Sequence, residues 1–456
     1  MHINNPSFKF FTNPSLIYLP LLEKLIHRAL IKKQFSLKNV GIVYIHHPLK
    51  TSVNLVDSML RLGAIPKNIF VLGKKYSECK TVVQQICKYG VHYQPCSDQL
   101  GLGQYNYSFT RDINLLWKEV GDNLGKDIKN LLILDHGGYA TSFVPAPLLK
   151  QYKVIAVEKT TGGLIKFKDQ GLPPFPLISV ADCAAKKVLE SPLIADAVVN
   201  KLLTLLPKNP ERITCGIIGF GAIGKAIATK LLSMNYKVII YDSRAPSRTL
   251  DGAFTDELDK LVRLSDYIFG CTGQESIKTI EAFIHAEKDK TLISCSSEDK
   301  EFLPLLKAIQ SKSNTIVRDP FSEIQYMTSK DATIRILKGG FPINFDHSGE
   351  SVPQRDIQLT RALVLTSIIQ AIQFFNKQSL LNKAGIYALD AQTQQFLANE
   401  WLACQPVARY SQDIIRNFQD IDWIINNSGG LYEPSSIIEE SHYKRSSSNH
   451  IKLNFK

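Results

Sequence analysis

The sequence contains no paired-cysteine motif. Its eight cysteines are scattered along the chain, and none belongs to a CxxC pair. Several of them stand within apolar runs, so free thiols in a reducing compartment fit better than disulfides or zinc ligation. The sequence therefore predicts no metal site.

Long apolar runs are also missing. No run reaches the roughly 18 apolar residues that a membrane-spanning helix needs. The N-terminal stretch has no basic segment, and Pro20 and Glu23 interrupt its apolar residues, so it does not resemble a secretion signal. We expect a cytoplasmic protein with no membrane partner.

Acidic residues are fewer than basic ones. The chain has 42 Asp and Glu against 54 Lys and Arg, a formal net charge of +12. Part of the excess lies in the last sixteen residues, which contain no acid. The basic residues there are Lys444, Arg445, Lys452 and Lys456. A basic surface can attract nucleic acid, but no nucleic-acid-binding motif accompanies it. We expect solvated charge, and a small-molecule substrate with no nucleic-acid partner.

The chain does contain enough apolar sequence for several domains. It has 456 residues, 44% of them hydrophobic and 21% charged, as in soluble globular proteins. Apolar runs alternate with helical stretches, which predicts parallel α/β architecture. Predicted strands cover 41–45, 69–73, 130–138 with its terminal turn, 154–158, 213–218, 238–241, 266–270, 291–294 and 315–317. Predicted helices cover 21–33, 51–62, 181–206 with an interruption at Pro192, 225–232 and 357–375.

Residues 213–242 carry the strongest motif. An apolar run leads into Gly219, Gly221 and Gly224, and a helical stretch and a second apolar run ending in Asp242 follow. The first glycine permits the turn, the second lets backbone N–H groups approach a pyrophosphate, and the third lets helix pack on strand. Ala222 and Ile223 open the helix whose N-terminus faces the phosphates. Asp242 is suited to the adenosine ribose hydroxyls, which favours NAD over NADP. The alternative is a glycine-rich turn in an empty Rossmann unit.

Polar residues follow several of the predicted strands. His47, His136, Glu158 and Thr160 all stand at or just beyond strand ends. Ligands bind beyond the carboxyl ends of strands in open parallel sheets. Each residue also has a structural alternative: His47 can cap a strand end, and Glu158 can hold the turn that follows it.

These motifs together resemble the S-adenosylhomocysteine hydrolase family. The likeness runs from about residue 40 to about 405 and is weak between 65 and 125. Its anchors are residues 134–138, 158–162, 219–224 and 271–273, and Asn344. The resemblance implies a Rossmann NAD-binding domain inserted in a second parallel α/β substrate domain, with tightly held NAD that oxidises a ribose 3′-hydroxyl and is later restored. The expected division is 1–196, substrate domain; 197–346, NAD-binding domain; 347–404, return to the substrate domain; and 405–456, C-terminal tail.

The resemblance also implies roles for individual residues. His47 matches a proton-transfer histidine, Glu158 a site glutamate, and Lys186 a lysine that assists at the 3′-oxygen; Lys186 can equally be one of a solvated pair with Lys187. Contacts to the cofactor are matched by Thr160, Thr161, Thr272 and Asn344, and Asp242 stands where the family has a glutamate.

Several positions depart from the family pattern. His136 replaces an aspartate, and Glu190-Ser191 replaces an Asp-Asn pair; we count His136 and Glu190 among the candidate catalytic residues. Leu49 and Thr51 replace a threonine and a glutamate that contact the nucleoside. A C-terminal lysine that reaches a neighbouring subunit's NAD is replaced by Glu433, although the resemblance still allows a homo-oligomer.

Three functions remain open. The first is an NAD-dependent enzyme with hydrolase architecture and an altered, nucleoside-type substrate, which oxidises a secondary hydroxyl. The second is a non-catalytic NAD-binding regulator or partner protein, supported by the lost nucleoside contacts. The third is a dehydrogenase that releases NADH. Because Leu49 and Thr51 offer no carboxylate, we expect little or no hydrolysis of S-adenosylhomocysteine.

Overall fold

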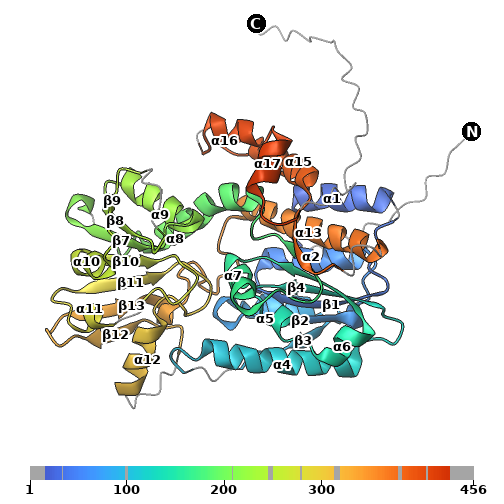
Figure 1. The fold of residues 1–456 in the computed structure, drawn as a ribbon, viewed down its shortest axis with the longest axis horizontal. Helices are drawn as coiled ribbons and strands as arrows, with labels where there is room; N and C mark the ends of the chain where they lie inside the picture. Colours follow the sequence, from blue (N-terminus) through green and yellow to red (C-terminus); the bar gives the residue numbers. More distant parts are fainter. Residues whose placement is uncertain are drawn as a thin grey trace, which may run out of the picture.

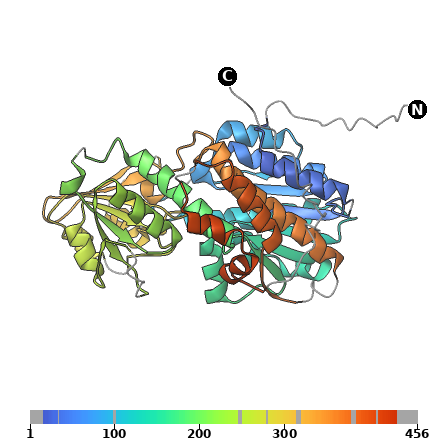
Figure 2. The same cartoon turned by 90° about the horizontal axis from the view of Figure 1, so that it is seen from above.

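The computed structural model describes residues 16–431, apart from 33, 98–100, 208, 245–249, 278–279, 313–318, 378–382 and 407–408. Two mostly parallel sheets form two units that lie side by side (Figures 1 and 2). The predicted basic segment at 444–456 and Glu433 lie outside the described residues.

The first unit is built on a parallel sheet with the order β14-β6-β5-β4-β1-β2-β3. The strands are β1 (Val40–His46), β2 (Ile69–Gly73), β3 (His92–Gln94), β4 (Asn130–Asp135), β5 (Lys153–Glu158), β6 (Pro176–Ser179) and β14 (Gly385–Ala388). In β1, Ile42 and Tyr44 join one core, whereas Val43 and Ile45 join the other, because side chains alternate between sheet faces. Both faces are therefore buried.

Helices cover both faces of this sheet. One core contains residues of α1 (Pro20–Ile31), α2 (Lys50–Arg61), α3 (Lys80–Cys87), α13 (Gln354–Asn376), α15 (Ala391–Leu402) and α17 (Ile421–Asn427). The other contains residues of α4 (Tyr105–Asn123), α5 (Tyr139–Ser142), α6 (Ala146–Gln151) and α7 (Thr161–Gln170). Figure 1 shows α4 along one side of the sheet and α1, α2 and α13 along the other. The short α16 (Gln412–Asn417) precedes α17.

The second unit has the sheet order β12-β13-β11-β10-β7-β8-β9, with only β12 antiparallel among the described strands. Its strands are β7 (Thr214–Ile218), β8 (Lys237–Tyr241), β9 (Ala253–Phe254), β10 (Tyr267–Gly270), β11 (Lys290–Ser294), β12 (Ile324–Met327) and β13 (Thr333–Ile336). Its helices are α8 (Ser191–Leu202), α9 (Ala222–Ser233), α10 (Leu258–Leu264), α11 (Glu281–Ile284) and α12 (Leu303–Lys312). The strand order reverses at β7, where such sheets bind ligands.

The predicted fold class is confirmed. The chain leaves the first sheet after β6, builds the second sheet, and returns through α13 to place β14 beside β6. The domain bounds given above stay predictions, and the strand predicted at 315–317 lies outside the described residues.

The helix predicted at 181–206 forms over a shorter range. Residues 184–202 are helical throughout, and the interruption expected at Pro192 is a π-helical turn, η3 (Lys186–Glu190), which leads directly into α8. Pro192 lacks the N–H for the regular helical hydrogen bond, and its ring crowds the preceding turn, which accounts for a disturbed helix at this place.

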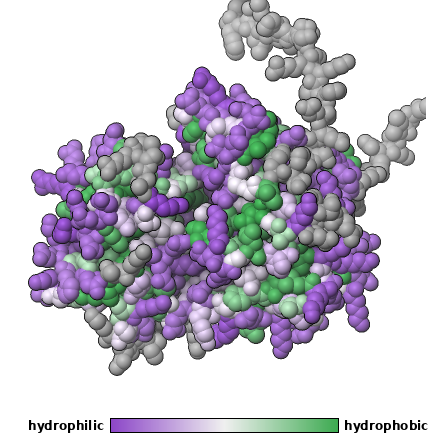
Figure 3. Space-filling model, viewed as in Figure 1, coloured by the Kyte–Doolittle hydropathy of each residue, from purple (hydrophilic) through white to green (hydrophobic). Residues whose placement is uncertain are grey.

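The helix α13 is long and apolar enough to span a membrane by length and composition alone. However, 89% of its most apolar window is buried inside the protein. It packs against α1, α2 and α15, which is the arrangement of a core helix. On the face shown in Figure 3, hydrophilic residues occupy most of the periphery.

Candidate functional site

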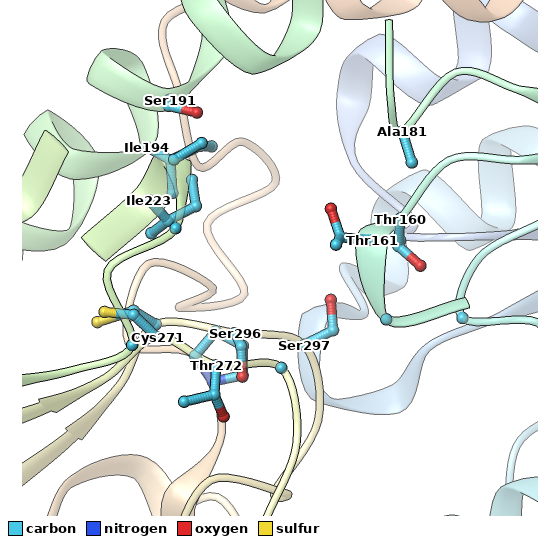
Figure 4. Close-up of a pocket in the computed structure, with 18 of the residues that line it drawn as sticks. Thr160, Thr161, Ala181, Ser191, Ile194, Ile223, Cys271, Thr272, Ser296 and Ser297 are labelled. Atoms are coloured by element: carbon cyan, nitrogen blue, oxygen red, sulfur yellow. The ribbon is translucent and has the colours of Figure 1, made fainter. Parts of the chain in front are cut away.

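A cavity of about 1160 Å³ is lined by residues of both units. Pockets for single small ligands are commonly about 300–1,000 Å³, so this one has room for a dinucleotide and a second molecule. Figure 4 shows Thr160 and Thr161 on one side of it, facing Ile223, Cys271 and Thr272 across the gap. Nearly all predicted site residues line it: His47, His136, Thr160, Thr161, Lys186, Glu190, Gly219, Gly221, Ala222, Ile223, Asp242, Thr272 and Asn344. Glu158 and Gly224 do not.

The glycine turn has the geometry that a pyrophosphate requires. Gly219 has φ +95°, in the left-handed region. A Cβ on Gly224 would lie 1.9 Å from the carbonyl oxygen of Gly219, so this position packs helix on strand. A Cβ on Gly221 would meet no atom within 4 Å, and Gly221 lines the cavity. The open side of Gly221 therefore faces the space that a phosphate would fill.

Asp242 is held in place by the same turn. Its carboxylate accepts hydrogen bonds from the backbone N–H of Phe220 at 2.7 Å and from that of Arg244 at 2.8 Å. It lies at the end of β8, beside the turn. This arrangement fits the ribose of an adenine dinucleotide.

A second turn lies at the end of β10. The buried carboxylate of Glu301 accepts hydrogen bonds from the Thr272 hydroxyl at 2.9 Å and from the Gly273 N–H at 2.7 Å. It thereby fixes residues 271–273 at the cavity wall. Burial raises the pKa of Glu301.

The two predicted site histidines contact each other. Nε2 of His47 lies 3.1 Å from Nε2 of His136, and Nδ1 of His47 lies 2.6 Å from the Ser77 hydroxyl. That hydroxyl donates to the carbonyl of Lys74 at 2.9 Å, so it accepts from His47 Nδ1–H. His47 Nε2 must then accept from His136 Nε2–H. His136 Nδ1 is left with a free lone pair.

Burial favours the neutral form of both histidines. Burial lowers the pKa of each well below 6.5, and nearby cations lower it further. For His136 these cations are Lys74, Lys159 and Lys186. A neutral imidazole can accept a proton, which is what a general base must do.

Glu158 lies in a different place from the one expected of a polarising residue. Its carboxylate, which is fully buried, accepts hydrogen bonds from the N–H groups of Gly137, Gly138 and Thr160 and from the Thr160 hydroxyl, at 2.7–3.0 Å. These contacts use its lone pairs and hold the turn that carries His136. We therefore assign Glu158 a positioning role, which corrects the direct role expected from the sequence.

Lys186 and Glu190 form an ion pair in η3. The ammonium lies 2.5 Å from a carboxylate oxygen of Glu190, and the Lys186 side chain is 21% exposed. Lys186 is therefore not one of a freely solvated pair, although Lys187 also lines the cavity. π-Helical turns are frequent at functional sites.

A buried ion pair that no sequence pattern predicted joins the two units beside this site. Lys74 follows β2 in the first unit, and Glu298 follows β11 in the second. The Nζ of Lys74 lies 2.6 Å from Oε1 of Glu298, and both side chains are at most 1% exposed. The Tyr139 hydroxyl donates to Glu298 at 2.8 Å, and Lys300 lies 2.7 Å from it. Burial opposes ionisation of Glu298, but Lys74 and Lys300 outweigh it and lower its pKa to about 2.

Metal ligation finds no support in the described chain. It contains no group of three His, Cys, Asp or Glu side chains placed to hold a metal ion. The eight cysteines are free; Cys79, Cys183, Cys215 and Cys295 are buried, whereas Cys87 and Cys404 are exposed.

Comparison with known proteins identifies the second unit. Residues 198–283 match the NAD-binding domain of D-isomer specific 2-hydroxyacid dehydrogenases. An uncharacterized protein of Mycobacterium tuberculosis is 29% identical over 76% of this chain and 67% of its own length. An adenosylhomocysteinase of Sulfolobus acidocaldarius is 22% identical over 80% of this chain and 85% of its own length.

Weaker matches are found among solved structures. D-Lactate dehydrogenase of Aquifex aeolicus, complexed with NAD and lactic acid, is 13% identical over 75% of this chain and 97% of its own, with a TM-score of 0.36. The second unit of the present chain is a Rossmann-like NAD-binding domain, and NAD is its cofactor. The likeness to adenosylhomocysteinase is distant, so the comparisons support a broad NAD-binding, dehydrogenase-like assignment.

Proposed function

We propose that the protein is an NAD-dependent enzyme that oxidises a secondary hydroxyl of a small, nucleoside-type or related substrate, in the manner of adenosylhomocysteinase but with an altered substrate site. The observation that carries this proposal is the hydrogen-bonded His47–His136 pair, which lines the same cavity as the NAD-binding turn. A protein that only stored NAD would not need a proton acceptor there.

The histidine pair provides a path for the hydroxyl proton. Bound NAD supplies the acceptor for the hydride that leaves carbon. Nδ1 of His136 accepts the proton that leaves oxygen. His136 Nε2–H then faces His47 Nε2 at 3.1 Å, and His47 Nδ1–H faces Ser77 at 2.6 Å, so the positive charge is shared along hydrogen-bonded groups.

Lys186 supplies positive charge at the reacting oxygen. It is anchored by Glu190 and faces the cavity. An ammonium held beside an oxygen stabilises the negative charge that develops there as the O–H proton leaves. Glu158 holds the turn that carries His136 by accepting hydrogen bonds from the N–H groups of Gly137 and Gly138, without touching the substrate.

Contacts between the units favour a closed site. The Lys74–Glu298 pair and the Tyr139 hydroxyl join the two units next to the histidines. His47 also stacks on Phe345 with ring centroids 4.3 Å apart. A closed site excludes water and would retain the cofactor between half-reactions.

A second candidate is a dehydrogenase that releases NADH. The match of residues 198–283 to a 2-hydroxyacid dehydrogenase domain favours it. The two proposals differ in the fate of the cofactor, which stays bound and is restored in the first and leaves reduced in the second.

The test is whether NAD on the purified protein becomes reduced. Absorbance at 340 nm is followed after addition of adenosine, S-adenosylhomocysteine or a 2-hydroxy acid, and filtration then separates bound from released NADH. We expect reduction in the unmodified protein and its loss in His136→Gln, with NAD affinity unchanged. Bound NAD that none of these alcohols reduces would contradict both enzyme proposals and favour the regulator.

A further inference from the structure

One arm of the cavity contains a charged guanidinium, that of Arg361, which hydride transfer does not require. It lies between the end of β1, the start of α2 and one face of α13. That face contributes Ile357, Thr360, Arg361 and Val364, the three-and-four spacing of a single helix side. Arg361 is the only charged residue among these four.

The guanidinium of Arg361 has unused hydrogen-bonding capacity. Its Nε donates to the Thr51 hydroxyl at 2.9 Å. No described acidic side chain forms an ion pair with it, and its two terminal nitrogens have no partner among the described residues. Those two parallel donors match the oxygens of a carboxylate or a phosphate.

Two further donors line the arm near Arg361. Lys159 Nζ donates one hydrogen bond to the carbonyl of Ile45, at 2.6 Å. His46 is 2% exposed, and neither ring nitrogen has a partner within the described chain. Burial lowers the pKa of His46 well below 6.5, and Lys159 and Arg361 lower it further, so a neutral imidazole stands beside Arg361 and Lys159. Burial also lowers the pKa of Lys159, to about 7.

The described acids of this region form no ion pair with Arg361. Glu158 is saturated by backbone donors, and Asp135 accepts from the N–H groups of His136 and Thr141 at 2.7 Å each. Glu350 accepts from the Thr51 N–H at 3.0 Å, and although its other oxygen is buried without a partner, it forms no ion pair with Arg361. The Arg361 charge is therefore left for a ligand.

We propose that Arg361, with Lys159 and His46, binds an oxyanion of the substrate, either a carboxylate or a phosphate. This rests on the proposed function only in placing the substrate in the same cavity. The anion would anchor the substrate in the arm, with its hydroxyl toward His136. Leu49, Leu55 and Ile357 supply apolar walls for the part between the two ends.

The experiment measures anion binding without turnover. Full-length protein loaded with NAD, so that its pyrophosphate site is filled, is titrated with phosphate, acetate or chloride at constant ionic strength. Calorimetry and the unfolding temperature give Kd. We expect saturable binding of phosphate or acetate but not of chloride, and the stronger of the two identifies the oxyanion.

Three variants separate recognition from folding. Arg361→Gln should raise Kd by about tenfold or more, because charge-assisted hydrogen bonds are lost. Thr51→Val removes the Nε contact but keeps the guanidinium, and should bind nearly as the unmodified protein does. Arg355→Gln, on the exposed first turn of the same helix, is the matched control and should bind normally.

Equal Kd values in the unmodified protein and Arg361→Gln would overturn the inference. So would a loss in Thr51→Val as large as that in Arg361→Gln, because the effect would then be structural. Neither result depends on reduction of NAD, so failure of the inference and failure of the proposed function are distinguishable.

Discussion

The two glycines Gly221 and Gly224 stand three residues apart but should respond to substitution in opposite ways. A Cβ at Gly221 meets nothing within 4 Å, and its φ of −72° and ψ of −168° are accessible to any residue. Gly221→Val should therefore fold normally, within about 1 kcal/mol of the unmodified protein. Its side chain would occupy the space in which a pyrophosphate must approach the backbone.

The loss of affinity follows from the hydrogen bonds that Gly221→Val prevents. Each charge-assisted bond to a phosphate oxygen contributes about 1.5–3 kcal/mol. Losing one should weaken NAD binding by about 10- to 150-fold, and losing two should abolish it in practice. Calorimetric titration with NAD measures this directly.

Gly224→Ala should instead damage the fold. Its Cβ would lie 1.9 Å from the Gly219 carbonyl oxygen, a contact that backbone movement must relieve. Overpacking of this kind costs about 1–3 kcal/mol or more, which lowers Tm by about 2–4 °C per kcal/mol for a unit of this size. Thermal unfolding of the apoprotein reports it.

A third glycine provides the control. Gly121 lies exposed in α4, and its Cβ would meet nothing within 4 Å. Gly121→Ala should stabilise the protein by about 0.4–1 kcal/mol without changing NAD affinity. Normal NAD affinity in Gly221→Val would refute the assignment of this turn, whatever the other two variants do.

Three more outcomes are expected. Asp242→Ala should weaken NAD binding and narrow the preference for NAD over NADP, measured as the ratio of the two Kd values; an unchanged ratio would remove Asp242 from the ribose site. Thiol release from S-adenosylhomocysteine should be slow or absent on NAD-loaded protein, and robust release that the double variant His47→Ala, Lys186→Ala abolishes would show that the ordinary family activity survives. Glu298 should contribute to stability at pH above about 4.5 and lose that contribution as pH falls toward about 2, because its pKa is depressed in the folded state. In urea unfolding, the difference in free energy of unfolding between the unmodified protein and Glu298→Gln should therefore shrink as the pH falls. A difference that does not depend on pH would contradict the assigned ionisation.

Local patterns in the sequence determined most of the secondary structure and the cofactor turn. The apolar runs predicted at 41–45 and 69–73 became β1 and β2, and the stretch at 357–375 became α13. The glycine turn and Asp242 were recognisable because their requirements, a positive φ, an open backbone and an acid after the second strand, are met by residues close in sequence.

Only the tertiary structure decided what the polar residues do. His47 and His136 are 89 residues apart in sequence and meet because β1 pairs with β4. Glu158 was expected at the substrate, but its backbone partners turn it away from the cavity.

Contacts across the fold carried no local signal at all. Glu298 reaches Lys74 from the other unit, and Arg361 reaches Thr51 from 310 residues away. A single charged residue in a helical pattern does not reveal which other residues will surround it. Strand order and the packing of one unit on the other decide that, because they bring residues that are far apart in the sequence into contact.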